Sequence, residues 1–162
     1  MDRASVRVAE PADFRAISAI FAEVDRMHEQ AHPDLFRQPE QEGRLDEYLL
    51  GLVDGPNSTM LVAELGGEVT GFVTVEVREA PPVPVFQPRR FGAINTMAVV
   101  PGLRRQGIGR LLFAAAESWA AARGATEIEL SVYEFNQGAV RFYEALGYGT
   151  VSRRMRRKLS IG

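Results

Sequence analysis

The fold of this chain is decided by residues 99–112, which read VVPGLRRQGIGRLL. An apolar run from Ile94 to Val100 ends at Pro101-Gly102, and a long alanine- and leucine-rich segment with a helical pattern follows. This order aims a helix N-terminus, with its unpaired N–H groups and positive dipole end, at whatever lies beyond the strand. The glycines let an anion approach the backbone and the arginines add positive charge, so the stretch predicts a phosphate-binding turn.

Two well-known phosphate-binding motifs do not fit this stretch. A P-loop needs a Lys-Ser or Lys-Thr pair, which the sequence lacks, and a dinucleotide-binding fingerprint needs glycine where the chain has Leu112. What remains is Arg104-x-x-Gly107-x-Gly109, which resembles the Arg/Gln-x-x-Gly-x-Gly/Ala signature of the GNAT family of N-acetyltransferases. For this hexapeptide alone, a plain strand–turn–helix joint is the alternative.

A second element strengthens the resemblance. Residues 136–148 read NQGAVRFYEALGY and are similar to the Asn-x-x-Ala-x-x-Phe-Tyr-x-x-x-Gly-Phe/Tyr element that ends the cofactor domain of the same family. The two elements occur in the family's order, separated by a helix and a strand of suitable length. The resemblance is close over 94–148 and loose over nearly the whole chain.

The resemblance implies an α/β (α+β) fold with a central mixed sheet of six or seven strands, splayed at strands 4 and 5 and flanked by about four helices. We expect one domain over residues 1–162, with an acceptor-side half at about 1–90 and a cofactor-binding core at about 91–148. The residue pattern agrees: helical spacing after Pro11 and near 45–52, a hairpin around Gly66-Gly67, and a strand over 126–132. Residues 28–39 are expected to be irregular, and the basic run 153–158 to form a final strand.

Composition narrows the function classes. The chain has 162 residues, 46% of them hydrophobic, no long apolar run and a formal net charge of −2, which suit one globular domain without a membrane span and disfavour nucleic-acid binding. The absence of cysteine removes disulfides, thiolate metal ligands and a cysteine nucleophile. A cytoplasmic, reducing location fits this composition. The basic run 153–158 could alternatively attract an acidic acceptor or the cofactor's 3′-phosphate.

The cofactor that the resemblance implies is acetyl-CoA. Its pyrophosphate is expected on the turn that comprises Arg104, Arg105, Gln106, Gly107, Ile108, Gly109 and Arg110. Its pantetheine arm is expected along the backbone of Met97, Ala98 and Val99. Asn136 would bond near the thioester and Ala139 would leave room for the cofactor, although Asn136 also suits a helix N-cap.

We expect Tyr143 to act as the general acid that protonates the leaving CoA thiolate, because a phenol with a pKa near 10 is protonated at neutral pH. The alternative is a core aromatic. The base is less well defined, since many family members carry a glutamate where this chain has Thr96. Glu76 is the first candidate, with Glu129 and Glu134 as others. A water chain or an acceptor that arrives neutral would need no base.

The acceptor, a primary amine of a small molecule, peptide or protein, is expected to bind near His28, His32, Phe36, Phe86 and Thr96. Pro33 disfavours a continued helix through the histidine pair, so no metal site is predicted. The proline-rich segment 81–88 must be a loop, either a spacer or a wall over the acceptor, and its apolar Val83, Val85 and Phe86, together with the last strand, are candidate homodimer surfaces. A catalytically weak acyl-CoA-binding sensor or scaffold is the alternative function.

Overall fold

The computed structural model describes residues 3–40 and 46–161. The chain divides into two compact units, Met1–Ser131 and Val132–Gly162, and each is described by itself. The expected start of the second helix near Leu45 lies outside the described residues.

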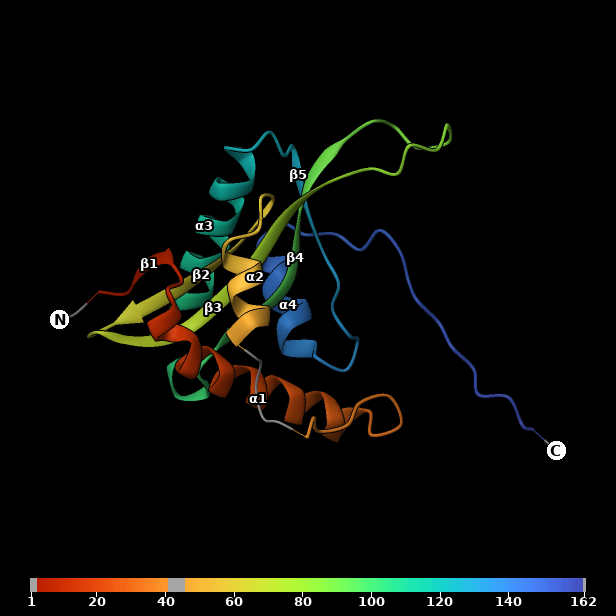
Figure 1. Cartoon of the computed structure of the whole chain (residues 1–162). Coiled ribbons are helices and arrows are strands. Elements are labelled where there is room, and N and C mark those ends of the chain that lie inside the picture. Colours follow the sequence, from red (N-terminus) through yellow and green to blue (C-terminus); the bar gives the residue numbers. More distant parts are fainter. Residues whose placement is uncertain (1–2, 41–45, 162) are drawn as a thin grey trace. The chain divides into compact units, whose positions relative to one another are not determined.

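A five-stranded mixed sheet forms the centre of the first unit (Figure 1). Its strands lie in the order in which they occur along the chain: β1 (Ser5–Val8), β2 (Ser58–Leu65), β3 (Glu68–Glu79), β4 (Arg90–Val99) and β5 (Glu127–Leu130). The first four pair antiparallel, whereas β5 runs parallel to β4. The mixed α+β fold class is therefore confirmed.

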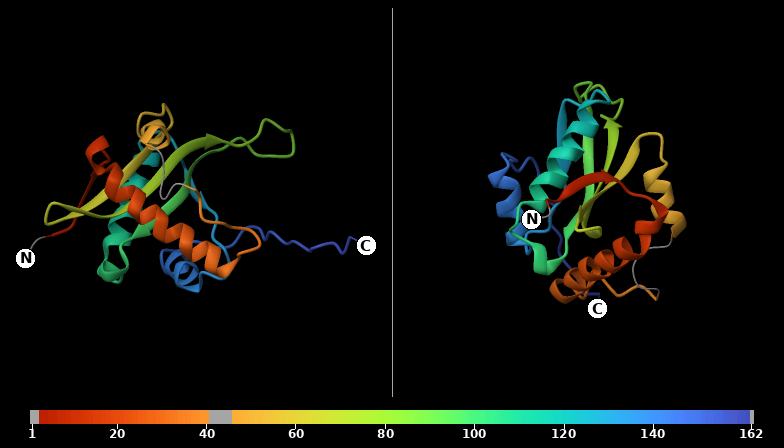
Figure 2. Two further views of the ribbon diagram at one scale, coloured as in Figure 1. Left: turned by 60° about the horizontal axis from the view of Figure 1, so that its bottom comes forward. Right: turned by 90° about the vertical axis from the view of Figure 1, so that its left-hand side faces the viewer.

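Helices cover both faces of this sheet, with α3 (Ile108–Ala121) on one face and α1 (Phe14–Ala31) and α2 (Asp46–Val53) on the other (Figure 2). A 3-10 turn, Pro11–Asp13, leads into α1, and a second one, Pro101–Leu103, follows β4. The proline that the sequence places before the first helix thus occupies the start of that turn, where its missing N–H costs nothing.

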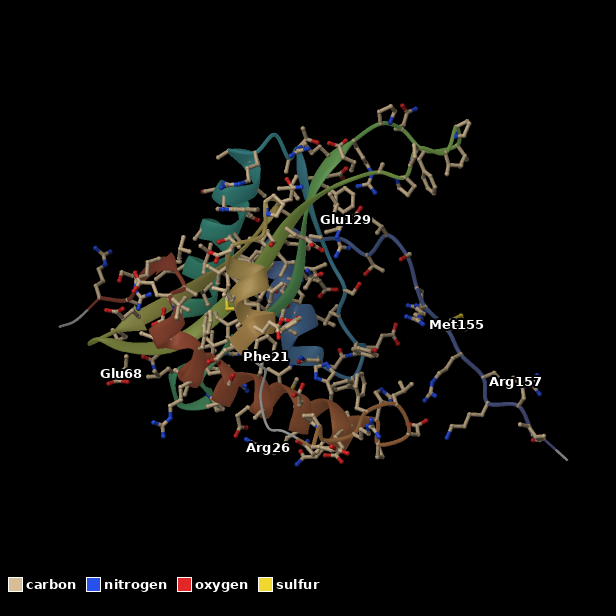
Figure 3. All side chains as sticks on the ribbon, viewed as in Figure 1. Phe21, Arg26, Glu68, Glu129, Met155 and Arg157 are labelled. Carbon is tan, nitrogen blue, oxygen red and sulfur yellow. The ribbon has the colours of Figure 1, made fainter. Side chains whose placement is uncertain are left out.

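The core on the α1 face follows from the spacing of apolar residues on α1. Phe14, Ile17 and Phe21 recur at helical spacing and are buried, and the Phe21 ring lies 4.5 Å from the Phe72 ring of β3. Figure 3 labels Phe21 among these side chains. On the other face Leu112 and Phe113 of α3 are fully or almost fully buried. Two apolar layers therefore hold the sheet in place.

The β2–β3 hairpin turns at Gly66 and Gly67, whose φ angles are 61° and 83°. Two consecutive positive φ values define the primed hairpin turn that a Gly-Gly pair favours, so this prediction is confirmed. At the opposite end of β3, residues 80–89 form the expected loop between β3 and β4. Val85 and Phe86 of this loop are exposed.

The second unit contains α4 (Gln137–Ala145) and an extended segment. Residues 149–161 form neither helix nor strand, and Met155 and Arg157 lie on this segment (Figure 3). The expectation of a final strand over 153–158 was wrong. A strand needs a partner edge for its backbone hydrogen bonds, and no described strand pairs with this segment.

Two more expectations need correction. The sheet has five strands within 3–40 and 46–161, not six or seven, in part because the expected final strand does not form. The irregular segment expected from residue 28 begins later, because the last residue of α1 is Ala31. His32 forms the C-cap of the helix and precedes Pro33. Within the part of the chain that the structure describes, no helix is long and apolar enough to cross a membrane.

Candidate functional site

The turn between β4 and α3 exposes a row of backbone N–H groups. Arg105 has a φ of 66° and Gly107 a φ of 86°, so the chain passes twice through the left-handed region before α3 begins at Ile108. Among the described residues, the amides from 105 to 110 donate no hydrogen bond. Six free donors in sequence, at the positive end of a helix dipole, form an anion-binding surface.

Side chains reinforce this surface. Arg104, Arg105 and Arg110 are exposed, and Gln106 donates weakly to the Gly102 carbonyl at 3.5 Å. A Cβ added to Gly107 would meet nothing within 4 Å, so the space beside this backbone is open. A phosphate group could therefore reach the amides without displacing protein atoms.

The end of β4 lies next to this turn, and on one side no strand of the described residues pairs with it. β5 pairs with β4 only from Phe91 to Ile94, whereas β3 pairs with it as far as Val99. The splay expected at strands 4 and 5 is thus present, and it begins just before a β-bulge at Asn95, a residue that has no partner in the β3 register.

A cavity of about 360 Å³ adjoins the same end of β4. Residues of α1 form one wall, and the end of β4 with the turn that follows forms the other. Its lining includes Ile20, Val24 and Ala98 as apolar residues and Glu23, Arg26 and Arg104 as charged ones. Glu23 and Arg26 form an ion pair at 2.5 Å along α1, and Figure 3 labels Arg26.

In the second unit, the Asn136 side chain caps α4 by accepting a hydrogen bond from the Ala139 amide at 3.1 Å. The N-cap interpretation of Asn136 is therefore confirmed. Tyr143 lies on α4, where its ring neighbours those of Phe142 and Tyr148 at 5.5 and 6.3 Å. Burial raises the pKa of the Tyr143 phenol above its ordinary value of 10.0. The phenol therefore keeps its proton throughout the neutral range.

The Glu76 carboxylate lies beside the bulge. It accepts a hydrogen bond from Asn95 Nδ2 at 3.2 Å and pairs with Arg78, whose guanidinium also contacts Asn95 Oδ1 at 3.3 Å. The structure thus brings a carboxylate from β3 to the side chain of Asn95, the residue before Thr96.

The other two candidate bases also form ion pairs. Glu129 pairs with Arg89 at 2.6 Å, and Glu134, in the second unit, lies 3.3 Å from Arg153. Glu129 is partly exposed and Glu134 is exposed, as is usual for charges at the ends of strands and in loops.

The histidines lie at the end of α1. His28 Nδ1 contacts the Val24 carbonyl at 2.8 Å, and its ring meets Phe36 edge-on at 5.0 Å, because residues 32–38 fold back over the helix. His32 ends the helix. His28 and Phe36 thus come together, while Phe86 lies on the distant β3–β4 loop. Within the described ranges, no group of three His, Cys, Asp or Glu residues could hold a metal ion.

Comparison with known proteins identifies the family. The Acetyltransferase (GNAT) family matches residues 21–148, which include most of the first unit and α4 of the second. The chain belongs to this family. This acetyltransferase is thus an acyl-CoA-dependent enzyme, and the resemblance found in the sequence is confirmed.

Individual proteins that are similar to this chain support the same family. The uncharacterised N-acetyltransferase YhfO of Bacillus subtilis is 27% identical over 89% of each chain. An aminoglycoside N(6′)-acetyltransferase type 1 of Klebsiella aerogenes is 30% identical over 70% of this chain and 73% of its own. The solved structure of a tetramutant of the BH1408 protein from Bacillus halodurans is 29% identical, with a TM-score of 0.90 over 96% of this acetyltransferase and 99% of that chain.

One contact in this acetyltransferase could not be inferred from the sequence. The Thr74 hydroxyl of β3 accepts a hydrogen bond from the Thr96 amide at 3.0 Å, at the bulge. Thr74 is buried, and a threonine inside an apolar strand gives no sign of such a role. The only signal was the polar pair Asn95-Thr96 within the apolar run of β4.

Proposed function

We propose that this acetyltransferase transfers an acetyl group from acetyl-CoA to a primary amine by direct attack of the amine on the thioester, within a single catalytic domain that spans both units. The observation that carries the proposal is the row of six amides from 105 to 110, which donate no hydrogen bond within the described residues, beside the end of β4 that β5 does not pair with. The two features suit, respectively, the pyrophosphate and the pantetheine arm of CoA.

The pyrophosphate would bind to the amides at the start of α3, with Arg104, Arg105 and Arg110 supplying positive charge. A helix N-terminus contributes about 0.3–1 kcal/mol toward a nearby anion. Gly107 and Gly109 keep side chains away from the phosphates, and Ile108, which is buried, anchors the helix start.

The pantetheine arm would pair with the open side of β4. The Val100 amide donates to the Thr70 carbonyl at 2.9 Å, so alternate residues of this end of β4 face β3. Ala98 shares the direction of Val100, whereas the backbone groups of Met97 and Val99 face the open side. Of the three expected pantetheine partners, Met97 and Val99 rather than Ala98 would therefore pair with the arm.

Bound acetyl-CoA supplies an activated acyl group and a thiolate leaving group. The Tyr143 phenol would donate its proton to the departing sulfur, and its raised pKa keeps that proton available. Asn136 and Ala139 would sit near the thioester. These roles rest on the likeness of residues 136–148 to the family's element. The chain has no cysteine to form a thioester of its own, which favours direct attack.

Glu76 is the candidate that would accept the amine proton, since its carboxylate contacts the side chain of Asn95, the residue before Thr96. The same carboxylate pairs with Arg78. The alternative function, an acyl-CoA-binding sensor or scaffold with little turnover, is supported by Thr96 at the position where many family members carry a glutamate. A measurable rate of acetyl transfer distinguishes the enzyme from the sensor.

The charge of the acceptor-side half indicates which class of amine it would bind. Residues 23–47, on the acceptor-side half, contain eight acidic and three basic residues. This excess attracts a cationic amine. The likeness to an aminoglycoside acetyltransferase points the same way, so we propose a small polycationic amine as the acceptor.

The test is release of free CoA thiol from acetyl-CoA in the presence of single amines: an aminoglycoside, a linear polyamine and a peptide with a free N-terminus. Because the protein has no cysteine, every thiol detected comes from CoA. We expect amine-dependent release with the aminoglycoside or the polyamine and acetylated product by mass spectrometry. Binding of acetyl-CoA without release for any amine would favour the sensor.

A further inference from the structure

The carbonyl of Val99 faces the open side of β4. In an antiparallel pair, residues alternate between those that bond to the partner strand and those that face away from it. Val100 bonds to Thr70 of β3 at 2.9 Å, so Val99, opposite Gly71, belongs to the other set. β5 does not reach this far, since its pairing ends at Ile94.

That carbonyl nevertheless has a partner. Arg104 Nε donates to it at 3.1 Å, from the turn five residues further along the chain. Arg104 is exposed, and its guanidinium makes no other hydrogen bond to the described part of the chain. The guanidinium therefore lies on the edge of β4 that the proposed function assigns to the pantetheine arm.

We propose that Arg104 is a positioning residue that couples the two halves of the CoA site: it covers the Val99 carbonyl in the free protein and releases it when phosphate groups bind to the turn. The inference rests on the proposed function. An anionic phosphate forms a stronger hydrogen bond with a guanidinium than a neutral carbonyl does. Phosphate binding thus draws Arg104 off the strand and frees Val99 for a pantetheine amide.

This coupling differs from a simple contribution of charge. If Arg104 only attracted phosphate, its removal would weaken phosphate binding and leave pantetheine unaffected. If it only held the turn in shape, its removal would weaken the binding of both. A residue that covers the carbonyl makes binding of one half favour binding of the other, and its removal makes pantetheine alone bind more tightly.

The experiment uses inorganic pyrophosphate and pantetheine as separate probes on the full chain, with dissociation constants from NMR titration. In the wild type, saturating pyrophosphate should tighten pantetheine binding about fivefold or more. In Arg104→Ala, pantetheine alone should bind as tightly as it binds the pyrophosphate-saturated wild type, and pyrophosphate should no longer change that affinity.

Arg110→Ala is the matched control, because Arg110 is exposed in the first turn of α3 and has no bond to β4. It should weaken pyrophosphate binding and keep the coupling. Equal pantetheine affinity with and without pyrophosphate in the wild type, or coupling that persists in Arg104→Ala, would overturn the inference. If acetyl-CoA itself binds in those cases, the proposed function stands; if it does not bind, both fail.

Discussion

The Thr74 hydroxyl and the Thr96 amide form a 3.0 Å hydrogen bond across the β-bulge of β4. The bulge leaves Asn95 without a partner in the register with β3, and the same hydroxyl lies 3.4 Å from the Thr96 carbonyl. The Thr74 hydroxyl thus contacts both the amide and the carbonyl of Thr96, the residue at which β4 resumes regular pairing with β3. We expect this contact to help position residues 97–99, which follow it directly and pair with β3.

Thr74→Val should therefore lower both stability and cofactor affinity. Loss of the hydroxyl leaves the Thr96 amide without its partner, which costs about 1–3 kcal/mol of unfolding free energy. Urea denaturation and acetyl-CoA titration measure the two effects. Thr74→Ser keeps the hydroxyl and should restore most of both; a serine variant as impaired as the valine one would refute the role of this bond.

Tyr143→Phe should reduce kcat by roughly 10²–10⁴ with little change in the affinity for acetyl-CoA, because it removes the proton donor and keeps the ring. Tyr133→Phe, an exposed tyrosine of the same unit, is the control and should leave kcat unchanged. Since burial raises the Tyr143 pKa, the alkaline loss of activity due to this phenol should fall above pH 10.0. An unaltered kcat in Tyr143→Phe would remove Tyr143 from the mechanism.

Glu76→Gln should slow acetyl transfer most at low pH, where fewer acceptor molecules arrive as neutral amines. Glu79→Gln is the control, because Glu79 lies on the same strand and also pairs with an arginine, Arg90, at 2.6 Å. Initial rates across pH separate the two variants. Identical pH profiles for both would show that the acceptor loses its proton without Glu76.

The ion pair of Asp13, in the 3-10 turn before α1, should make the stability of the fold depend on pH in the acid range. Hydrogen bonds from Arg7, at 2.7 and 2.9 Å, hold the pKa of Asp13 below its ordinary value of 3.8. A lowered pKa in the folded state stabilises the protein above pH 3.8, and this contribution is lost as the pH falls through the lowered pKa.

Asp13→Asn should thus cost about 1–3 kcal/mol at neutral pH and less as the pH falls below 3.8. Glu68→Gln, at an exposed position next to the β2–β3 turn (Figure 3), should change little at any pH. Chemical denaturation at several pH values provides the comparison. A constant difference between Asp13→Asn and wild type down to acid pH would contradict the account.

The sequence predicted the parts of this fold that local chemistry determines. The Gly66-Gly67 hairpin follows from two residues that tolerate positive φ, and the turn from Pro101 to Ile108 follows from a strand pattern that ends in Pro-Gly before a helical one. The helix-capping role of Asn136 was likewise predictable from its position before α4.

Tertiary contacts account for what the sequence missed. The contact of Arg104 with Val99 joins a turn to a strand end, and that of Thr74 with Thr96 joins residues 22 positions apart. Neither contact can be predicted from the pattern of neighbouring residues in the sequence. The expected final strand had apolar positions such as Met155 and Leu159, but strand formation also needs an edge that accepts it, which the sequence of the segment does not reveal.

The central claim, that the turn before α3 binds the CoA pyrophosphate, is tested most directly by calorimetric titration of acetyl-CoA into wild type, Gly107→Glu and Gly67→Glu. Both glycines have positive φ, 86° and 83°, and open space where a Cβ would lie, so both substitutions impose similar backbone strain. The glutamate at 107 alone would put a negative charge beside the phosphates. We predict that Gly107→Glu weakens binding at least about a hundredfold and that Gly67→Glu binds like wild type. Equal affinity of Gly107→Glu and wild type would contradict the account.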